Sequence, residues 1–228
     1  MTRKTIIALS VAFCLSLSAC AKAPEESGES PAPAATPAPT AAAVEEGRTI
    51  LPLPDTTMDN LTDAILSVSF EEGSAYVDDK GRMQLDVKIY TYDKYDMVDI
   101  AGLKLGDILS GHAGEVEITA MERDESGRIH LNGGLEMGGF DLVTDDCGIF
   151  FEQGYNDSKS WYELGQATIR VSADFIGRDN ADLDQGELII YPGDFLVGAV
   201  TNYYFTPHNT TIRVENGQIV ELERRYVP

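Results

Sequence analysis

Apolar and polar residues alternate along several segments beyond residue 64, a pattern that predicts β-strands with one buried face. The predicted strands are 65–70, 83–90, 115–121, 128–132, 167–172, 187–191, 211–216 and 218–226. No segment sustains the 3.6-residue period of a helix, and only YDKYDMVDIAGL (92–103) suits a single helical turn. This pattern favours an all-β fold with little helix, mainly antiparallel and built as a sandwich or barrel.

Turn residues separate the predicted strands. DDKG (78–81) and DESG (124–127) combine acidic residues with a closing glycine. Asn216-Gly217 lies between two alternating segments and predicts a type I′ hairpin, because both residues tolerate positive φ. We expect DESG to form a second hairpin between the strands on either side of it.

The segment before the first strand has a different composition. Residues 21–47 lack apolar periodicity and contain PAPAATPAPTAAA with glutamates on both sides. Such a segment cannot bury enough surface to offset the entropy of ordering, so we expect a disordered spacer. At about 3 Å per residue it can extend up to about 80 Å. The predicted organisation is a Pro/Ala-rich linker over 20–48 and one acidic β-rich domain over 49–228.

The first twenty residues have the features of a secretory signal. Arg3 and Lys4 precede an apolar stretch over 6–17, which is too short and wrongly flanked for a transmembrane helix. Small residues then lead to Cys20. The sequence LSAC (17–20) resembles the lipobox of bacterial lipoproteins.

The lipobox resemblance implies that a signal peptide of residues 1–19 is removed and that Cys20 carries a diacylglycerol on its sulfur. The protein would then be anchored to a bacterial membrane in the cell envelope and would face the extracytoplasmic side. Several acyl chains anchor a protein more firmly than one. An ordinary secretory signal cleaved after Ala19 is the alternative, and it would leave Cys20 as a free thiol.

The net charge and the cysteine content limit the classes of binding partner and the disulfides that this protein can have. The chain has 17 basic and 38 acidic side chains and a net charge of −21, which argues against nucleic acid as a partner. Cys14 belongs to the signal and Cys20 to the lipid, so Cys147 has no partner for a disulfide. The expected partners are the membrane, through the lipid, and an extracellular ligand or protein.

Two clusters of aromatic residues are the candidate binding residues. Rings on the loops of a β domain can stack on sugars or anchor a protein partner. The candidates are Tyr155, Trp161, Tyr162, Tyr203, Tyr204 and Phe205. Packing in the core is the alternative role for these rings.

The segment RDNADLDQGE (178–187) is the candidate metal site, because calcium prefers oxygen ligands and extracellular calcium can fill weak sites. The candidate ligands are Asp179, Asp182, Asp184 and Glu187. The order of an EF-hand is broken, since Gln185 occupies the glycine position. A solvated acidic loop is the alternative, and no cofactor other than calcium is expected.

No catalytic motif is evident. Neither GxSxG nor SxxK occurs, and the histidines lack the spacing of zinc ligands. The order His130, Cys147, Arg170 is similar to that of sortases, but the carboxylates next to the thiol disfavour a thiolate. We therefore expect Cys147 to be buried and inert.

The stretch IAGLKLGDILSG (100–111) is similar to part of the PDZ domains of secreted bacterial proteases. The residues that follow it alternate like a hairpin, whereas a PDZ domain needs a helix to line its peptide groove. We therefore interpret this stretch as a turn that leads into a strand.

Together these features favour a lipid-anchored extracytoplasmic protein with a non-catalytic binding domain whose ligand is a glycan or a protein. Two alternatives remain. One is an envelope-associated hydrolase that uses paired carboxylates, which leave no sequence motif. The other is a structural component of the envelope.

Overall fold

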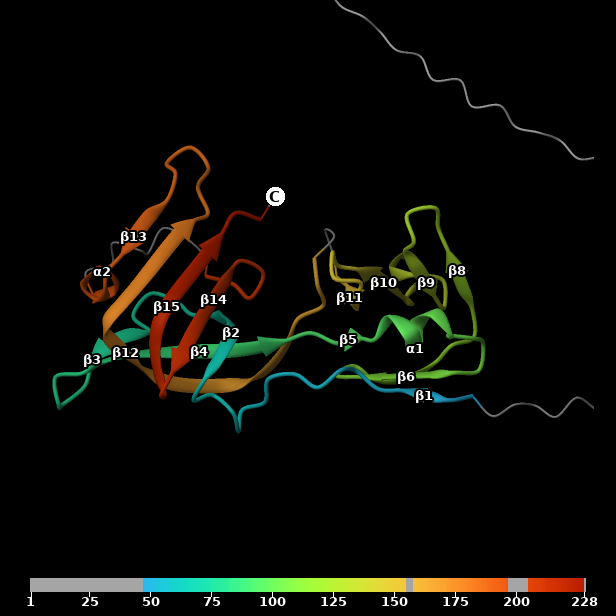
Figure 1. Ribbon diagram of the computed structural model, residues 1–228, viewed down its shortest axis with the longest axis horizontal. Coiled ribbons are helices and arrows are strands. Elements are labelled where there is room, and N and C mark those ends of the chain that lie inside the picture. The colour runs from blue at the N-terminus through green and yellow to red at the C-terminus, as the bar shows by residue number, and fades with distance from the viewer. Residues whose placement is uncertain (1–46, 155–157, 197–204, 228) are drawn as a thin grey trace, which may run out of the picture. The chain divides into compact units, whose positions relative to one another are not determined.

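Strands are the main secondary structure in the computed structural model, which describes residues 47–154, 158–196 and 205–227 (Figure 1). Contacts group Val44–Pro228 into one unit. The described helical elements are all short: α1 (Met97–Ala101), α2 (Pro192–Leu196) and the 3₁₀ helix η1 (Leu135–Met137). The predicted all-β, mainly antiparallel fold with little helix is confirmed.

Seven strands form the largest sheet, in the order β13-β12-β15-β14-β2-β4-β3. They are β2 (Ala64–Ser69), β3 (Ala75–Val77), β4 (Met83–Thr91), β12 (Tyr162–Asn180), β13 (Leu188–Ile190), β14 (Thr210–Glu215) and β15 (Gln218–Arg225). The long strand β12 pairs antiparallel with β4 in its first half and parallel with β15 in its second half. Because β12 has both partners, the sheet closes on itself, and we call these seven strands the barrel.

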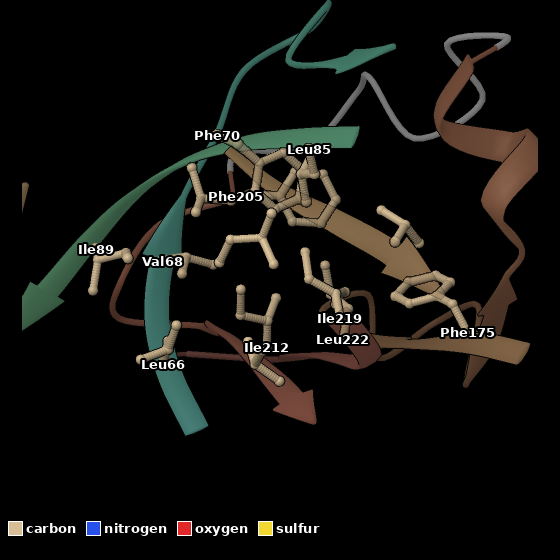
Figure 2. Close-up of a cluster of buried hydrophobic side chains, with 14 of the residues drawn as sticks. Leu66, Val68, Phe70, Leu85, Ile89, Phe175, Phe205, Ile212, Ile219 and Leu222 are labelled. Carbon is tan, nitrogen blue, oxygen red and sulfur yellow. The ribbon is translucent and has the colours of Figure 1, made fainter. Parts of the chain in front are cut away.

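Alternation along the strands fills the barrel with apolar side chains. In β4, for example, Leu85, Val87 and Ile89 are buried and the residues between them face outward. Figure 2 shows this core, to which β2, β14 and β15 contribute their own alternating residues. Removing this apolar surface from water is the main source of the barrel's stability.

Two further sheets are formed by strands of the chain segment between β4 and β12 together with β1, which precedes the barrel strands. Their strands are β1 (Thr49–Ile50), β5 (Lys94–Tyr95), β6 (Ile108–Gly111), β7 (Gly114–Glu117), β8 (Met121–Arg123), β9 (Ile129–Leu131), β10 (Phe140–Thr144) and β11 (Phe150–Gln153). The sheet orders are β5-β11-β10-β9-β8 and β1-β6-β7. Residues 93–153 together with β1 have their own cluster of buried apolar side chains, and we call them the inserted region.

Three turns share one sequence pattern and one geometry. They are DDKGR (78–82), DESGR (124–128) and DDCGI (145–149). In each, the first aspartate accepts hydrogen bonds from the backbone N–H groups two and four residues later, and the glycine has positive φ. The DESG hairpin predicted from the sequence is confirmed between β8 and β9. The third turn exposes Cys147, so the expectation of a buried cysteine is wrong.

The hairpin predicted at Asn216-Gly217 is also confirmed. It joins β14 to β15, and its two central residues have φ of 50° and 71°. Both angles are positive, as a type I′ turn requires.

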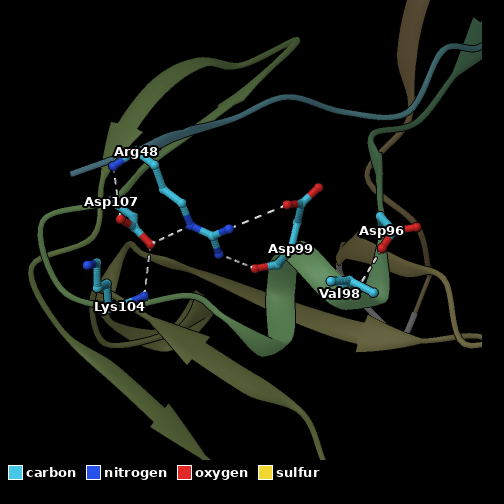
Figure 3. A network of polar contacts seen from close by, with 6 residues as sticks. All are labelled: Arg48, Asp96, Val98, Asp99, Lys104 and Asp107. Atoms are coloured by element: carbon cyan, nitrogen blue, oxygen red, sulfur yellow. Dashed lines mark hydrogen bonds and ion pairs between the residues drawn. The ribbon is translucent and has the colours of Figure 1, made fainter.

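Side-chain oxygens fix the chain around α1 (Figure 3). The helical turn predicted in 92–103 forms here, and Asp96 caps it by accepting a hydrogen bond from the N–H of Val98 at 2.7 Å. In the following turn Asp107 is fully buried and accepts hydrogen bonds from the N–H groups of Arg48 (3.1 Å) and Lys104 (3.0 Å). The turn expected in the PDZ-like stretch is therefore held by a buried carboxylate.

The predicted strand 115–121 is wrong in one respect, because it is divided in two. Strand β7 ends at Glu117 and β8 begins at Met121. Between them, the side-chain oxygen of Asn132 accepts hydrogen bonds from the N–H groups of Thr119 and Ala120. A side chain thus replaces the neighbouring strand as hydrogen-bond partner.

Neither helix in the described parts of the chain has the length and the apolar content needed to span a membrane.

Candidate functional site

The six predicted aromatic residues have different positions. Tyr155, Tyr203 and Tyr204 lie outside the described residues. Phe205 is buried in the barrel core, where its ring stacks on that of Phe70 at 4.2 Å between centroids. The structure brings the other two, Trp161 and Tyr162, into contact with further aromatic and charged side chains.

Three short segments pair side by side around Trp161 and Tyr162. They are residues 92–95, β11 and residues 158–162. Phe151 lies opposite Lys94, and a bridge pairs Gln153 with Lys159. Because successive residues of extended chain point to opposite sides, this pairing sorts the side chains onto two faces. One face is aromatic and cationic, and the other is polar.

The aromatic face surrounds one ammonium group. The Lys159 Nζ atom lies 4.1 Å from the ring centroid of Tyr92, 5.4 Å from that of Phe151 and 6.0 Å from that of Trp161. The Tyr92 ring meets the Trp161 ring edge to face at 5.1 Å. We call Tyr92, Phe151 and Trp161 the aromatic cluster. Its contacts with Lys159 are cation–π interactions.

Hydrogen bonds and ion pairs hold the edges of the aromatic cluster. The indole Nε1 of Trp161 donates to Nδ1 of His208 at 3.1 Å. Burial lowers the pKa of His208, which favours the neutral ring that this hydrogen bond requires. Lys94 also lies over the Tyr92 ring, at 4.8 Å, but its charge is paired with Asp55 at 2.8 Å.

A groove of about 360 Å³ runs along the aromatic cluster. Tyr92 and Trp161 line it, together with the hydroxyl-bearing residues Ser67 and Thr211 and the amide of Asn209. Rings beside short polar side chains can pack on an apolar face of a ligand and bind its polar groups at the same time.

The opposite face carries a chain of titratable groups, which we call the polar cluster. Asp93 is buried and accepts a hydrogen bond from the N–H of His112 at 2.8 Å, while the Nδ1 atom of the same histidine lies 2.7 Å from its other oxygen. The His112 ring stacks on Tyr162 at 5.3 Å. Tyr162 and Ser160 donate their hydroxyls to the two carboxylate oxygens of Glu152, at 3.0 and 3.1 Å.

Burial shifts the acidity of the polar cluster. It raises the pKa of Glu152 above the usual value, with a further contribution from the charge of Asp93, although Tyr162 and Ser160 donate hydrogen bonds to it. Burial and the nearby carboxylates also raise the pKa of Tyr162. A carboxyl group with a raised pKa beside a second carboxylate is the arrangement that acid–base catalysis uses.

The fold gives the candidate calcium ligands different partners. Asp179 is buried and forms an ion pair with Arg224, whose Nε lies 2.8 Å from its Oδ1. Glu187 pairs with Arg178 at 3.1 Å, and Asp182 accepts a hydrogen bond from the N–H of Asp184. Within the described ranges, no group of three or more His, Cys, Asp or Glu side chains is placed to hold a metal ion.

Comparison with known proteins adds no relative: no family model matches the chain, and no curated protein or solved structure matches it.

Sequence reasoning did not find most members of this site. Tyr92, Phe151 and Lys159 on one face, and Asp93 and Glu152 on the other, come from segments far apart in the sequence. The segment YDKY (92–95) carries only a weak local signal, because period 2 places one aromatic and one charged residue on each face: Tyr92 with Lys94, and Asp93 with Tyr95. It does not tell which segments pair.

Proposed function

We propose that the protein is a lipid-anchored, extracytoplasmic binding protein of a bacterial cell envelope and that a saccharide binds in the groove along the aromatic cluster. The observation that carries this proposal is the Trp161 indole, which His208 holds in the wall of the groove next to Tyr92. Rings in this position stack on the C–H faces of sugars, while neighbouring hydroxyl and amide groups bind sugar hydroxyls. A protein partner is the alternative ligand.

Intrinsic fluorescence tests this proposal directly. Trp161 is the only tryptophan in the chain, so its emission reports on the groove alone. We expect binding of a saccharide to shift that emission. Calorimetry should then show affinity lost in Trp161→Ala and kept in Tyr76→Ala, which removes an exposed ring from β3 outside the groove. Equal affinities of the two variants would contradict the proposal.

The anchor is tested separately. We expect the wild-type protein to partition into detergent and Cys20→Ser to remain in the aqueous phase, because the variant lacks the sulfur to which lipid is attached. Equal partitioning of the two would exclude lipid at Cys20.

A second function is favoured by the polar cluster. The raised pKa of Glu152 and the nearby charge of Asp93 suit a glycoside hydrolase with paired carboxylates. New reducing ends released from cell-wall glycans by the wild type, and absent with Glu152→Gln, would support hydrolysis in place of binding alone. Binding without any release would support the first proposal.

A further inference from the structure

The charges that line the groove differ from those of the whole protein. The chain carries a net charge of −21, yet the groove contains the cationic side chains Lys159, Arg213 and Arg225 against the carboxylates Glu221 and Glu223. A groove in which cations outnumber anions is unusual for so acidic a chain, and it sets the sign of the ligand charge that the groove favours.

Both arginines in the groove are already neutralised. Arg213 pairs through Nε with Glu221 at 2.9 Å and also contacts Glu215. Arg225 pairs with Glu223 at 2.7 Å. These four lining groups therefore contribute little net charge, and the positive charge of the groove lies on Lys159.

Lys159 has no such partner in the parts of the chain that the structure describes. Its ammonium contacts the rings of the aromatic cluster, and no described carboxylate lies within ion-pair distance. An ammonium has three N–H donors, which cation–π contacts leave without hydrogen-bond acceptors. Lys159 can therefore donate to an anionic ligand without breaking an ion pair to any described residue.

The geometry points to an anionic saccharide as the ligand: we infer that a sugar ring packs on Trp161 while a carboxylate or phosphate of the same ligand accepts hydrogen bonds from Lys159. This inference rests on the proposed saccharide binding. A cationic ligand fits less well, because Lys159 and Lys94 both lie over the Tyr92 ring. A charge-assisted hydrogen bond to Lys159 gives the groove its preference among sugars.

The experiment compares matched pairs of polymers with the full chain in detergent. One pair is polygalacturonate and its methyl ester, in which esterification removes the carboxylate charge. The other pair is a phosphorylated mannan and the same mannan without phosphate, so the two pairs distinguish a carboxylate from a phosphate. Calorimetry measures each affinity for the wild type and for the variants Lys159→Gln, Lys80→Gln and Trp161→Ala.

We expect the anionic member of at least one pair to bind roughly fivefold to tenfold more tightly than its neutral counterpart. Lys159→Gln should remove this preference, so that the two members of each pair bind with equal affinity. Lys80→Gln makes the same change of charge in the turn 78–82, outside the groove, and should keep the preference. Added salt should weaken only the binding that depends on Lys159.

Different failures have different meanings. Equal affinity for charged and neutral polymers, with both lost in Trp161→Ala, would overturn the anionic ligand and leave the proposed saccharide binding intact. A preference that survives Lys159→Gln would overturn the role of Lys159. Absence of binding to all four polymers, or binding that Trp161→Ala leaves unchanged, would overturn both the inference and the proposed function.

Discussion

The barrel and the inserted region bury similar apolar residues, but the hydrogen-bond partners of their backbone groups differ. The barrel contains long strands, such as β4 and the 19-residue β12, whose ladders supply most of its backbone hydrogen bonds. The strands of the inserted region have two to five residues. Backbone groups between such short strands need other partners, because buried N–H groups are rarely left without one.

Aspartate side chains supply many of those partners in the inserted region. Asp93, Asp107 and Asp141 are buried there, and the first two accept hydrogen bonds from backbone N–H groups. In the barrel, the buried Asp179 faces the cation of Arg224 and also accepts a hydrogen bond from the N–H of Ala181 at 3.0 Å. Acidic residues in this chain therefore do more than keep its surface soluble: several of them determine local structure.

The largest expected effect is in the barrel. Asp179→Ala removes the carboxylate that faces the buried Arg224. We expect the free energy of unfolding to fall by about 3 to 5 kcal/mol, because the buried cation loses this ion pair. Urea denaturation measures this change. Asp184→Ala, in the same acidic segment but exposed, should change the free energy of unfolding by about 0.5 kcal/mol or less. Equal losses in the two variants would show that the Arg224 pair is not buried in solution.

The next effect is expected at the turn after α1. Asp107→Ala leaves two backbone N–H groups without their acceptor, and we expect a loss of about 2 to 3 kcal/mol. The control is Asp99→Ala, because Asp99 pairs with the same Arg48 but is half exposed. It should cost about 0.5 kcal/mol or less. A loss of similar size in the control would mean that Arg48, and not the buried acceptor, stabilises the turn.

We expect the stabilisation of the same turn by Asp107 to decrease at acidic pH. Burial alone would raise the pKa of Asp107, but hydrogen bonds from Lys104 and Arg48 outweigh it and hold that pKa below its usual value. The stabilisation by the ionised carboxylate is therefore complete above the pKa of the unfolded chain and is lost as the pH falls through the folded pKa. The difference in stability between wild type and Asp107→Ala should shrink over that interval.

The same contrast explains how much could be predicted from the sequence. Most strands of the barrel were predicted, because one face of each packs in the core and the other faces water, which produces clear alternation. Strand β3 was not predicted, and β12 extends beyond both ends of the predicted 167–172. Strand β11 was missed because Phe150 packs in the inserted core and its neighbour Phe151 lies in the aromatic cluster. Two adjacent rings on opposite faces conceal the period. The turn DDCG was not predicted, because Cys147 was considered only as a candidate nucleophile and not as a turn residue.

Candidate site residues were predicted only where a local signal existed. Trp161 was found because it is aromatic and lies in a segment rich in turn residues. Lys159 and Glu152 were not, because their roles depend on pairing between β11, residues 92–95 and residues 158–162. Phe205 has the same local signal as Trp161, yet it packs in the barrel core. Composition alone does not tell on which side of a sheet a ring lies.

Two matched substitutions, one in each region, test whether the two regions unfold together, and each is expected to have a smaller effect than those above. Gly81 in the barrel and Gly127 in the inserted region occupy the same position in turns of the same type, with φ of 73° and 88°. At both, the position that a Cβ atom would occupy is open space. Replacement by alanine therefore adds only backbone strain, about 1 to 2 kcal/mol in each case. Because contacts group Val44–Pro228 into one unit, we expect both variants to lower one common transition equally. Hydrogen exchange that rises only in the mutated region would show that the two regions unfold separately.

The smallest effect is expected at the junction of the two regions, in the polar cluster. The raised pKa of Glu152 means that its ionised form is disfavoured in the folded protein. The folded state then binds a proton at higher pH than the unfolded state does, so this group adds stability as the pH falls through the folded pKa.

The variant Glu152→Gln is neutral at every pH. At pH 7 it should lie within about 1 kcal/mol of the wild type, and the wild type should gain relative to it on acidification. Glu163→Gln, an exposed neighbour on β12, should follow the wild-type profile. If the profiles of wild type and Glu152→Gln run parallel, Glu152 is hydrated in solution, and the hydrolase alternative loses the buried acid on which it depends.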